Sequence, residues 1–363
     1  MALYPRNPAR LELSELFLHY DLDGLWVKNL ATIRYLTGFS GSTAQLMVRP
    51  SGERLLLVDS RYTTQACEEC KGCEVRQIAK PIDDMGAAWC ECGAKRIGFE
   101  ARQVTVIEHQ TLKALLPEAE WVGVTENLAL LRSIKSADEI AKIRATCALA
   151  HAAYEDLLAA IVPGMSEKEA AWLLDRRFRE RGAKGNSFDS IVGGGPRAAL
   201  VHGQPSERRF VTGDMILVDR GAILNGYVSD ETTTVVLGKA DDRLREIYGL
   251  VKEAHDRCIA AVKPGASCRE LDAIAREVIV NGGYGEFFGH STGHGVGLEV
   301  HEQPMISANA EGTLEEGMIF SVEPGIYLPD WGGVRIEDLV LVTATGCECL
   351  TLADKTLTEL TVA

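Results

Sequence analysis

The sequence has no long hydrophobic run. No stretch of its 363 residues approaches the roughly 20 consecutive apolar residues that a membrane-spanning helix needs. The N-terminal segment MALYPRNPARLELSEL also lacks an apolar core of signal-peptide length. These absences predict a cytoplasmic protein with no membrane partner.

The chain also lacks an excess of positive charge. It has 38 Lys and Arg against 52 Asp and Glu, which gives a formal net charge of −14. A chain this acidic is repelled by nucleic acid and by anionic membrane surfaces. We therefore expect neither as a partner. The length allows two domains with a sizeable core.

A phosphate-binding signature is missing as well. The glycine-rich stretch GGGP within residues 186–206 has no following Lys-Ser or Lys-Thr pair. It does not match the G-x-G-x-x-G pattern that opens a helix either. The sequence therefore gives little support to nucleotide binding.

The ten cysteines are expected to be reduced thiols, because the chain shows no secretion signal. Five of them cluster as C-x2-C-x2-C and C-x-C: Cys67, Cys70, Cys73, Cys90 and Cys92. Such spacing can hold zinc or an iron–sulfur cluster. The first three lie in a short acidic segment that reads as a helix and a turn, so we favour incidental thiols over a structural metal or a redox role.

Two aspartates organise the second half of the chain. The segment 213–234 reads GDMILVDRGAILNGYVSDETTT, two β-rich runs around an Asn-Gly turn signal, and predicts an antiparallel hairpin that carries Asp219 and Asp230. One turn position puts the two directly opposite each other. The alternative puts Asp219 opposite Thr232, with Asp230 as its diagonal neighbour. Both registers leave the carboxylates on one face, where they repel each other unless a cation lies between them.

This pattern occurs twice. Residues 316–325 (EGMIFSVEPG) resemble 213–221 (GDMILVDRG), so Glu323 corresponds to Asp219. The later strand GGVRIEDLVLV supplies Glu337 as the first hairpin supplies Asp230. A unit of about 100 residues that repeats predicts a pseudo-twofold α/β domain in which four carboxylates converge.

The preceding helices repeat as well. Residues 160–170 (AIVPGMSEKEA) match 261–271 (AVKPGASCREL). Both carry the capping-box pattern, Ser166 with Glu169 and Ser267 with Glu270, which predicts a helix start at each serine.

Histidines lie between the two copies. The segment FFGHSTGHGVGLEVHE (287–302) contains His290, His294 and His301 among glycines. Four carboxylates with one or two imidazoles suit a pair of divalent ions such as Mn²⁺, and they also admit Co²⁺ or Zn²⁺.

These residues resemble the pita-bread metallopeptidases (family M24), which comprise aminopeptidase P, prolidase and methionine aminopeptidase, with creatinase as a metal-free relative. The motifs D-x10-D, GHGVGLEVHE, VEPGIY and VRIED occur in the family's order. The resemblance covers essentially the whole chain. It implies an α/β fold with a creatinase-like N-terminal domain at residues 1–128 and a pseudo-twofold pita-bread catalytic domain at residues 129–363.

The resemblance also implies roles for individual residues. A dinuclear metal site would take the ligands Asp219, Asp230, His294, Glu323 and Glu337. Glu323 would also accept a proton from the attacking water, and His202 and His301 would donate to the oxyanion or the leaving nitrogen. Beyond these roles we expect two substrate-binding residues, His290 and Arg335. His290, four residues before His294, would line the pocket or orient the ligand, and Arg335 is near enough in sequence to Glu337 to pair with it or with a substrate carboxylate.

The implied activity is hydrolysis of Xaa-Pro bonds, in peptides with proline at the second position. An Xaa-Pro aminopeptidase and an Xaa-Pro dipeptidase both remain open. Two other functions also remain open: a metal-independent, creatinase-like C–N hydrolase and a non-catalytic binding module on the same fold. Family members of this length also imply a homodimer.

Two positions depart from the family pattern. Val201 stands before His202 where proline is common, and Thr233 stands where the pattern S-D-x-T-R-T has arginine. The second change removes a guanidinium that would support nearby acidic groups.

Within the N-terminal domain we expect strands at LDGLWVKN (22–29), IRYLTGF (33–39), AQLMVRP (44–50) and ERLLLVDS (53–60). Arg61 and Tyr62 follow the last of these, and we interpret them as surface residues.

Overall fold

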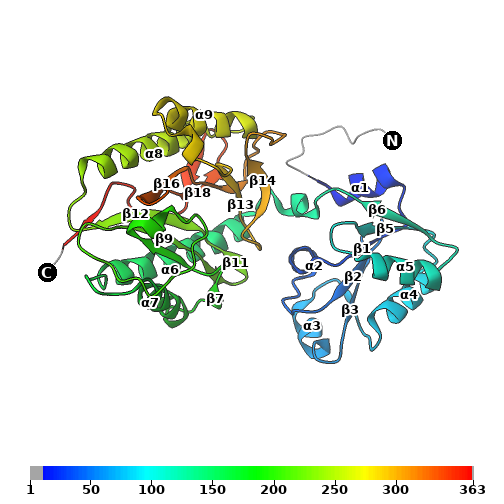
Figure 1. Cartoon of the computed structure of the whole chain (residues 1–363). Helices are drawn as coiled ribbons and strands as arrows, with labels where there is room; N and C mark the ends of the chain where they lie inside the picture. Colours follow the sequence, from blue (N-terminus) through cyan, green and yellow to red (C-terminus); the bar gives the residue numbers. More distant parts are fainter. Residues whose placement is uncertain (1–10, 362–363) are drawn as a thin grey trace. The chain divides into compact units, whose positions relative to one another are not determined.

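The computed structural model describes residues 11–361 of the chain. They divide into two compact units, residues 11–132 and residues 133–361 (Figure 1). Each unit has apolar cores of its own. Over the described residues, every helix is too short or too polar to cross a lipid bilayer.

The N-terminal unit is built on one mixed six-stranded sheet with the order β4-β3-β2-β1-β5-β6. The neighbours of β2 are antiparallel to it, whereas β1–β5, β5–β6 and β3–β4 are parallel pairs. The strands are β1 (Gly24–Val27), β2 (Gln45–Val48), β3 (Arg54–Val58), β4 (Glu74–Gln77), β5 (Arg96–Glu100) and β6 (Glu120–Val124).

Helices cover both faces of this sheet. Because side chains alternate along a strand, Leu25 and Val27 of β1 enter one apolar cluster and Trp26 enters another on the opposite face. The first cluster includes residues of α1 (Leu13–Tyr20), α2 (Leu30–Thr37) and α3 (Thr63–Glu69). The second includes residues of α4 (Pro81–Glu91) and α5 (Val106–Leu115), and a 3-10 turn at Leu128–Arg132 ends the unit.

One strand prediction for this unit is wrong. Residues 33–39 lie largely within α2, not in a strand. The side chain of Asn29 caps the helix by accepting a hydrogen bond from the Thr32 N–H, and Gly38 ends it with a φ of 84°. The apolar residues in this stretch suggested a strand, but the cap on each side specifies a helix. The other three predicted strands are confirmed as β1, β2 and β3.

The C-terminal unit has three layers. The pair α6 (Ala137–Leu158) and α7 (Glu167–Glu180) packs on one face of the strands, and the pair α8 (Asp242–Ala261) and α9 (Cys268–Asn281) packs on the other. Figure 1 shows the two pairs on opposite sides of the strands. Strand β9 (Met215–Arg220) contacts both layers, because Ile216 and Val218 face α6 and α7 while Leu217 faces the other pair.

Two larger sheets form the middle layer, with the orders β20-β12-β9-β8 and β14-β13-β15-β18-β19. Two small sheets, β11-β10-β7 and β16-β17, complete the unit. Besides β9, the strands are β7 (Gly185–Asn186), β8 (Ile191–Gly194), β10 (Ala222–Leu224), β11 (Tyr227–Val228), β12 (Glu231–Leu237), β13 (Gly293–Gly295), β14 (Glu302–Ile306), β15 (Ile319–Val322), β16 (Gly325–Leu328), β17 (Gly332–Arg335), β18 (Asp338–Val342), β19 (Cys347–Cys349) and β20 (Glu359–Leu360), with 3-10 turns at Gly195–Ala199 and Gly285–Phe287.

The predicted repeat is present in this unit. A helix pair followed by an antiparallel strand pair occurs first as α6, α7, β9 and β12, and again as α8, α9, β15 and β18. The capping box predicted at Ser166 is complete. At Ser267 the structure gives only one of the two bonds, from the Glu270 N–H to the serine hydroxyl. The α/β fold class predicted from the sequence is confirmed.

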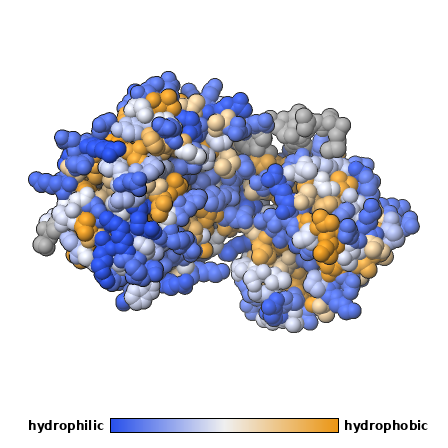
Figure 2. All heavy atoms as spheres, viewed as in Figure 1, coloured by the Kyte–Doolittle hydropathy of each residue, from blue (hydrophilic) through white to orange (hydrophobic). Residues whose placement is uncertain are grey.

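Hydrophilic residues dominate the visible face of the C-terminal unit, with apolar residues scattered among them (Figure 2). The conspicuous exposed aromatic side chain of α7 is Trp172, which is 71% exposed.

Candidate metal centre

The first two carboxylates come from the predicted hairpin. Strands β9 and β12 are antiparallel, with Asp219 opposite Thr232, and Asp230 directly precedes β12. The turn is centred on Asn225 and Gly226, whose φ angles are 53° and 85°, as the hairpin turn favoured by Asn-Gly requires. The second of the two registers considered from the sequence is therefore correct.

The other two carboxylates come from the second half of the unit. Glu323 follows β15 and Glu337 precedes β18. The Glu337 N–H donates to the carbonyl oxygen of Thr232 at 3.1 Å, and the Thr232 hydroxyl donates to Oε2 of Glu337 at 2.7 Å. These contacts bring the second half of the repeat against the first at the point where the carboxylates lie.

Close backbone packing positions His294. It lies on β13 between Gly293 and Gly295. A Cβ atom at Gly293 would collide with the Ser321 carbonyl, and one at Gly295 would collide with the backbone of Gln303. Only glycine allows β13 to approach its neighbours this closely.

The tautomer of His294 follows from its contacts. Nδ1 lies 3.1 Å from the carbonyl oxygen of Gly295, which can only accept a hydrogen bond. Nδ1 therefore carries a proton. This leaves Nε2 facing Glu323 Oε1 at 3.2 Å and Asp230 Oδ2 at 3.7 Å. In a metal-binding histidine, the ring nitrogen that does not bind the metal usually donates its proton to a carboxylate, a backbone carbonyl or water.

The carboxylates are buried close together. Burial, with the negative charges of Glu337 and Asp219, raises the pKa of Asp230 well above its ordinary value. Burial and the charge of Glu323 do the same to the pKa of Glu337. Although burial opposes the shift, contact with His294 lowers the pKa of Glu323 to about 2. Burial also opposes the shift of His294, yet Glu323 raises the pKa of the imidazole to about 9.

The donor set fits divalent metal. Asp230, His294 and Glu337 offer ligand atoms that all lie within 4.8 Å of one another. Among the described residues, Oδ1 of Asp219 is buried without a hydrogen-bond partner. Carboxylate oxygens with one imidazole nitrogen suit Mn²⁺, Co²⁺ or Zn²⁺, and a cation would relieve the repulsion among the buried carboxylates.

A cavity of about 480 Å³ opens onto these ligands. Both His202 and His301 are exposed side chains on its wall. The ring centroid of His301 lies 4.3 Å from that of His294. Although the His301 side chain reaches solvent, partial desolvation of its ring in the cavity wall and then the charge of His294 lower the pKa of His301. The structure brings every residue of the predicted site to this cavity: His202, Asp219, Asp230, His290, His294, His301, Glu323, Arg335 and Glu337.

Arg335 pairs with a different carboxylate from the one suggested by the sequence. Its Nη2 donates to Oδ2 of Asp219 at 2.6 Å, and within the described residues it makes no hydrogen bond or ion pair with Glu337. Asp219 is 116 positions away along the chain, so local spacing could not identify the pair. Nη1 also donates at 3.4 Å to the carbonyl oxygen of Val201 and so tethers the loop before His202.

Tyr327 is a site residue that sequence reasoning missed. Its hydroxyl accepts from Nη1 of Arg335 at 2.9 Å and lies 2.9 Å from Nε2 of His290. His290 Nδ1 contacts the Ser291 carbonyl at 2.8 Å and so carries the proton, which means that the tyrosine donates to Nε2. The motif VEPGIY contains Tyr327, and strand alternation in β16 could have suggested that it faces the site.

The structure also corrects the expectation at Thr233. A guanidinium is present beside this residue, because Nη1 of Arg220 donates to the Thr233 hydroxyl at 3.1 Å. Arg220 is fully buried and its Nη2 donates to Oε2 of Glu231 at 2.7 Å. The charge missing from β12 therefore comes from the neighbouring strand β9.

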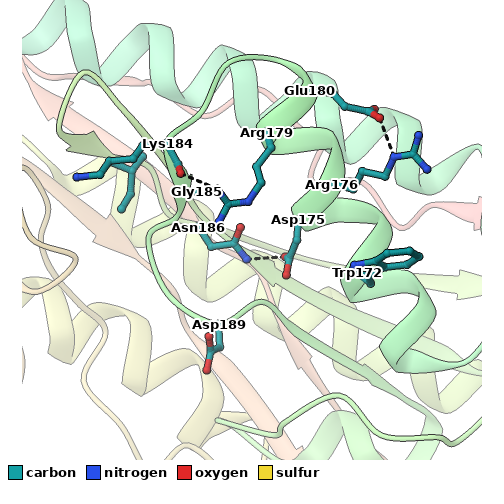
Figure 3. A pocket seen from close by; sticks show the side chains of 10 residues that line it. Trp172, Asp175, Arg176, Arg179, Glu180, Lys184, Gly185, Asn186 and Asp189 are labelled. Carbon is teal, nitrogen blue, oxygen red and sulfur yellow. Dashed lines mark hydrogen bonds and ion pairs between the residues drawn. The ribbon is translucent and has the colours of Figure 1, made fainter.

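A larger cavity of about 720 Å³ lies between α7 and β7 (Figure 3). Several of its polar side chains pair with each other, as Figure 3 shows for Arg176 with Glu180 and for Asn186 with Asp175. None of the predicted site residues lines it. The chemistry therefore belongs to the smaller cavity, which holds the buried carboxylates and imidazoles.

The cysteine cluster lies in the N-terminal unit. Cys67 is in α3, Cys70 ends that helix and Cys73 lies in the following turn. Burial raises the pKa of Cys73 to about 11. The incidental nature of these thiols stays a prediction. In the same unit Arg61 pairs with Asp59 at 2.7 Å, and the Tyr62 hydroxyl lies 2.5 Å from that of Ser42.

Comparisons with known proteins give two family matches. Residues 141–344 match the model of metallopeptidase family M24, and residues 11–134 match the creatinase/prolidase N-terminal domain.

Named relatives cover most of the chain. An Xaa-Pro dipeptidase of Pyrococcus furiosus is 46% identical over 238 residues, which is 66% of this chain and 68% of that protein. The structure of an Xaa-Pro dipeptidase from Bacillus anthracis superposes with a TM-score of 0.92 at 39% identity and covers 96% of this chain and 98% of that one. The structure of an X-Pro aminopeptidase from Thermotoga maritima superposes with a TM-score of 0.87 at 36% identity, with 96% and 99% covered.

Proposed function

The chain belongs to metallopeptidase family M24, and from this we propose that it is a metal-dependent dipeptidase that hydrolyses Xaa-Pro bonds. The observation that carries the proposal is the convergence of five ligand-type residues on one cavity, Asp219, Asp230, His294, Glu323 and Glu337. The relatives named Xaa-Pro dipeptidase support the substrate class.

The proposed cofactor is a pair of divalent ions, with Mn²⁺ as the first candidate. When bound, such ions supply a Lewis acid for the scissile carbonyl and lower the pKa of a water molecule. Asp230, His294 and Glu337 would hold one part of the centre, since their ligand atoms already lie together. Asp219 would add its unpartnered Oδ1.

Glu323 is the proposed proton acceptor. Its carboxylate accepts from the Ser321 hydroxyl at 3.0 Å, and the same hydroxyl accepts from the His294 N–H at 3.1 Å. In the metal-free protein, although burial opposes the shift, contact with His294 lowers the pKa of Glu323 to about 2, so the carboxylate is ionised at neutral pH. A fixed, ionised carboxylate beside the ligand imidazole can take a proton from the attacking water.

His202 and His301 are the proposed donors to the developing charge. Both are exposed at the cavity and neither is used by a salt bridge in the described structure. The lowered pKa of His301 favours a neutral ring at neutral pH, and a neutral imidazole still offers one N–H to an oxyanion or to the leaving nitrogen.

The remaining wall of the cavity suits a proline ring. It includes the apolar side chains of Phe188, Ile191, Val201, Val300 and Met305. An apolar wall next to polar catalytic groups is what a pyrrolidine ring attached to a scissile amide requires.

His290 is proposed to line the substrate pocket, with its ring fixed by the Ser291 carbonyl and by the contact chain through Tyr327 to Arg335. The guanidinium of Arg335 is occupied mainly by protein acceptors, Asp219 and Tyr327 among them.

An Xaa-Pro aminopeptidase is the second candidate, because the aminopeptidase from Thermotoga maritima is similar over nearly the whole chain. The comparisons do not favour the metal-independent hydrolase or the non-catalytic module. A homodimer is also proposed, and the cytoplasmic location expected from the sequence stays a prediction.

The test is a substrate panel with defined metal content. Protein dialysed against chelator and reconstituted with Mn²⁺ is assayed on Xaa-Pro dipeptides, Xaa-Pro-Yaa tripeptides and Met-Ala peptides. We expect cleavage of the dipeptides, no cleavage of Met-Ala, and no activity for Asp230→Asn, with the exposed Asp330→Asn as the matched control. Preference for tripeptides would support the aminopeptidase, and full activity after complete metal removal would exclude the metallopeptidase.

A further inference from the structure

Three of the ligand-type residues are each followed directly by a charged residue. Asp219 precedes Arg220, Asp230 precedes Glu231, and Glu337 precedes Asp338. Because neighbouring side chains in a strand point to opposite faces, the second member of each pair lies on the face away from the cavity. None of the three lines the cavity, and all are at most 5% exposed.

These residues are joined by ion pairs behind the ligands. Nη2 of Arg220 lies 2.7 Å from Oε2 of Glu231. Nζ of Lys355 lies 2.5 Å from Oε1 of Glu231 and 3.1 Å from Oδ1 of Asp338. We call Arg220, Glu231, Lys355 and Asp338 the backing network. Its charges alternate in sign, so each buried charge has an opposite neighbour.

Lys355 connects the two halves of the repeat. It belongs to neither ligand-bearing strand pair, since it lies between β19 and β20. Its two partners follow Asp230 of the first half and Glu337 of the second half. These two ligands belong to the group whose ligand atoms lie within 4.8 Å of one another. The ammonium group thus ties together the backbone on which both ligands are mounted.

Arg220 secures the first half. The pair Arg220–Glu231 is directly cross-strand and stands next to the pair Asp219–Thr232 in the same ladder. The guanidinium also stacks on the ring of Tyr154 at 3.5 Å. A slip of one residue would turn Asp219 away from the cavity, and a buried ion pair that must stay matched opposes such a slip.

We propose that Lys355 is a positioning residue of the metal centre, which acts through Glu231 and Asp338 to keep the ligand atoms of Asp230 and Glu337 close together, where they would hold metal. Arg220 assists by fixing the register of β9 and β12. The inference rests on the proposed metal-dependent function and deepens it. Outer partners of this kind typically change metal affinity by tenfold to a hundredfold.

The test uses metal-free full-length protein and Mn²⁺ alone. Equilibrium dialysis should show binding weaker by about tenfold to a hundredfold for Lys355→Met, while the exposed Lys263→Met should bind as the wild type does. At saturating Mn²⁺ the kcat of Lys355→Met should recover toward the wild-type value, with KM little changed. A lower melting temperature with unchanged Mn²⁺ affinity would overturn the proposal, because it would indicate a merely structural residue.

A swap across the Arg220–Thr233 contact gives a second, independent readout. Arg220→Leu should weaken Mn²⁺ binding, and Thr233→Arg added to the same protein should restore it, because the guanidinium returns to the same space from β12. If Lys355→Met does not fold, the same dialysis is done with Lys355→Gln, which keeps a hydrogen-bond donor at this position. Failure of both to fold, or a swap without recovery, would count against the network.

The proposed activity and the proposed role of Lys355 are tested by separate measurements. A wild-type protein that leaves every Xaa-Pro peptide intact would overturn the proposed activity. The ratio of Mn²⁺ affinities between wild type and Lys355→Met needs no substrate and decides the role of Lys355 by itself.

Discussion

The hydroxyl of Thr232 donates to Oε2 of Glu337 at 2.7 Å and accepts from Nε of Arg335 at 3.0 Å. This one side chain therefore connects a carboxylate of the second half with the arginine that pairs with Asp219 of the first half. Thr232 itself stands opposite Asp219 in the ladder of β9 and β12. The two halves of the metal centre are coupled through a residue that is not itself a ligand candidate.

Replacing Thr232 by valine keeps the shape of the side chain and removes both hydrogen bonds. Since a buried polar group left without a partner costs about 1–3 kcal/mol, we expect the free energy of unfolding to fall by about that amount. Mn²⁺ binding should also weaken. Chemical denaturation and dialysis measure both effects, with the exposed Thr345→Val as control. Equal stability and affinity in the two variants would contradict the coupling.

The histidines should separate by role. His294→Ala should lose metal first, because His294 is the imidazole among the ligand atoms that lie together. His202→Ala and His301→Ala should keep near-full metal content and lose turnover by about a hundredfold or more, since they would serve the transition state. Metal analysis and kinetics on Xaa-Pro dipeptides test this division. It is wrong if either of the latter variants strips the metal.

The metal-free protein should lose stability as the pH rises toward 9. Glu323 raises the pKa of His294 to about 9 in the fold, whereas an unfolded histidine titrates near 6.5. Protonation therefore stabilises the fold fully below about pH 6.5, and this contribution is lost as the pH rises through about 9. The stabilisation from the lowered pKa of Glu323 is fully present above its ordinary value of 4.5 and is lost only as the pH falls through about 2, so it does not vary in this pH range.

Thermal unfolding of chelator-treated protein between pH 6 and 9.5 measures this loss. His294→Gln should flatten the dependence of the melting temperature on pH. His151→Gln, which alters a histidine outside the cavity lining, should leave that dependence unchanged. An unchanged slope in His294→Gln would assign the effect to another group.

The cysteine cluster should be dispensable for hydrolysis. Replacing Cys67, Cys70 and Cys73 by serine should leave turnover within a few-fold, because these residues belong to the N-terminal unit and not to the cavity lining. Elemental analysis of the wild type and the variant completes the test. Loss of bound zinc or iron together with unfolding would reveal a structural metal.

The proposed homodimer is tested by light scattering. A single chain has a mass of 39.5 kDa, so a dimer should give about twice this value at working concentration. A mass that stays at the single-chain value over the whole concentration range would refute the dimer.

Local patterns in the sequence were sufficient to predict the hairpin, its second copy and a helix start. The Asn-Gly turn with β-rich runs on each side specified the hairpin of Asp219 and Asp230, and its second copy pointed to Glu323 and Glu337. The capping box at Ser166 marked a helix start that the structure confirms. These features depend on residues only a few positions apart, which is the range over which turn geometry, strand alternation and helix capping act.

Tertiary structure decided what local patterns left open. The sequence admitted two turn positions between β9 and β12, and the folded turn, centred on Asn225 and Gly226, places Asp219 opposite Thr232. The strand predicted at residues 33–39 lies largely in a helix, because caps at Asn29 and Gly38 bound it and the helix packs Ile33 and Leu36 into the apolar cluster on one face of the sheet. The contact between Arg220 and Thr233 could not be read from local spacing, because the two residues lie on opposite strands, 13 positions apart.

The ion pairs that the sequence could not predict join residues far apart along the chain. Arg335 finds Asp219 across 116 positions, and Lys355 reaches Glu231 across 124. Such pairs form only once the two halves have packed and water has been excluded, since a buried charge then requires an opposite charge wherever the chain provides one. The sequence by itself therefore determined which residues could form the centre, and the packing of the two halves decided which of them hold one another in place.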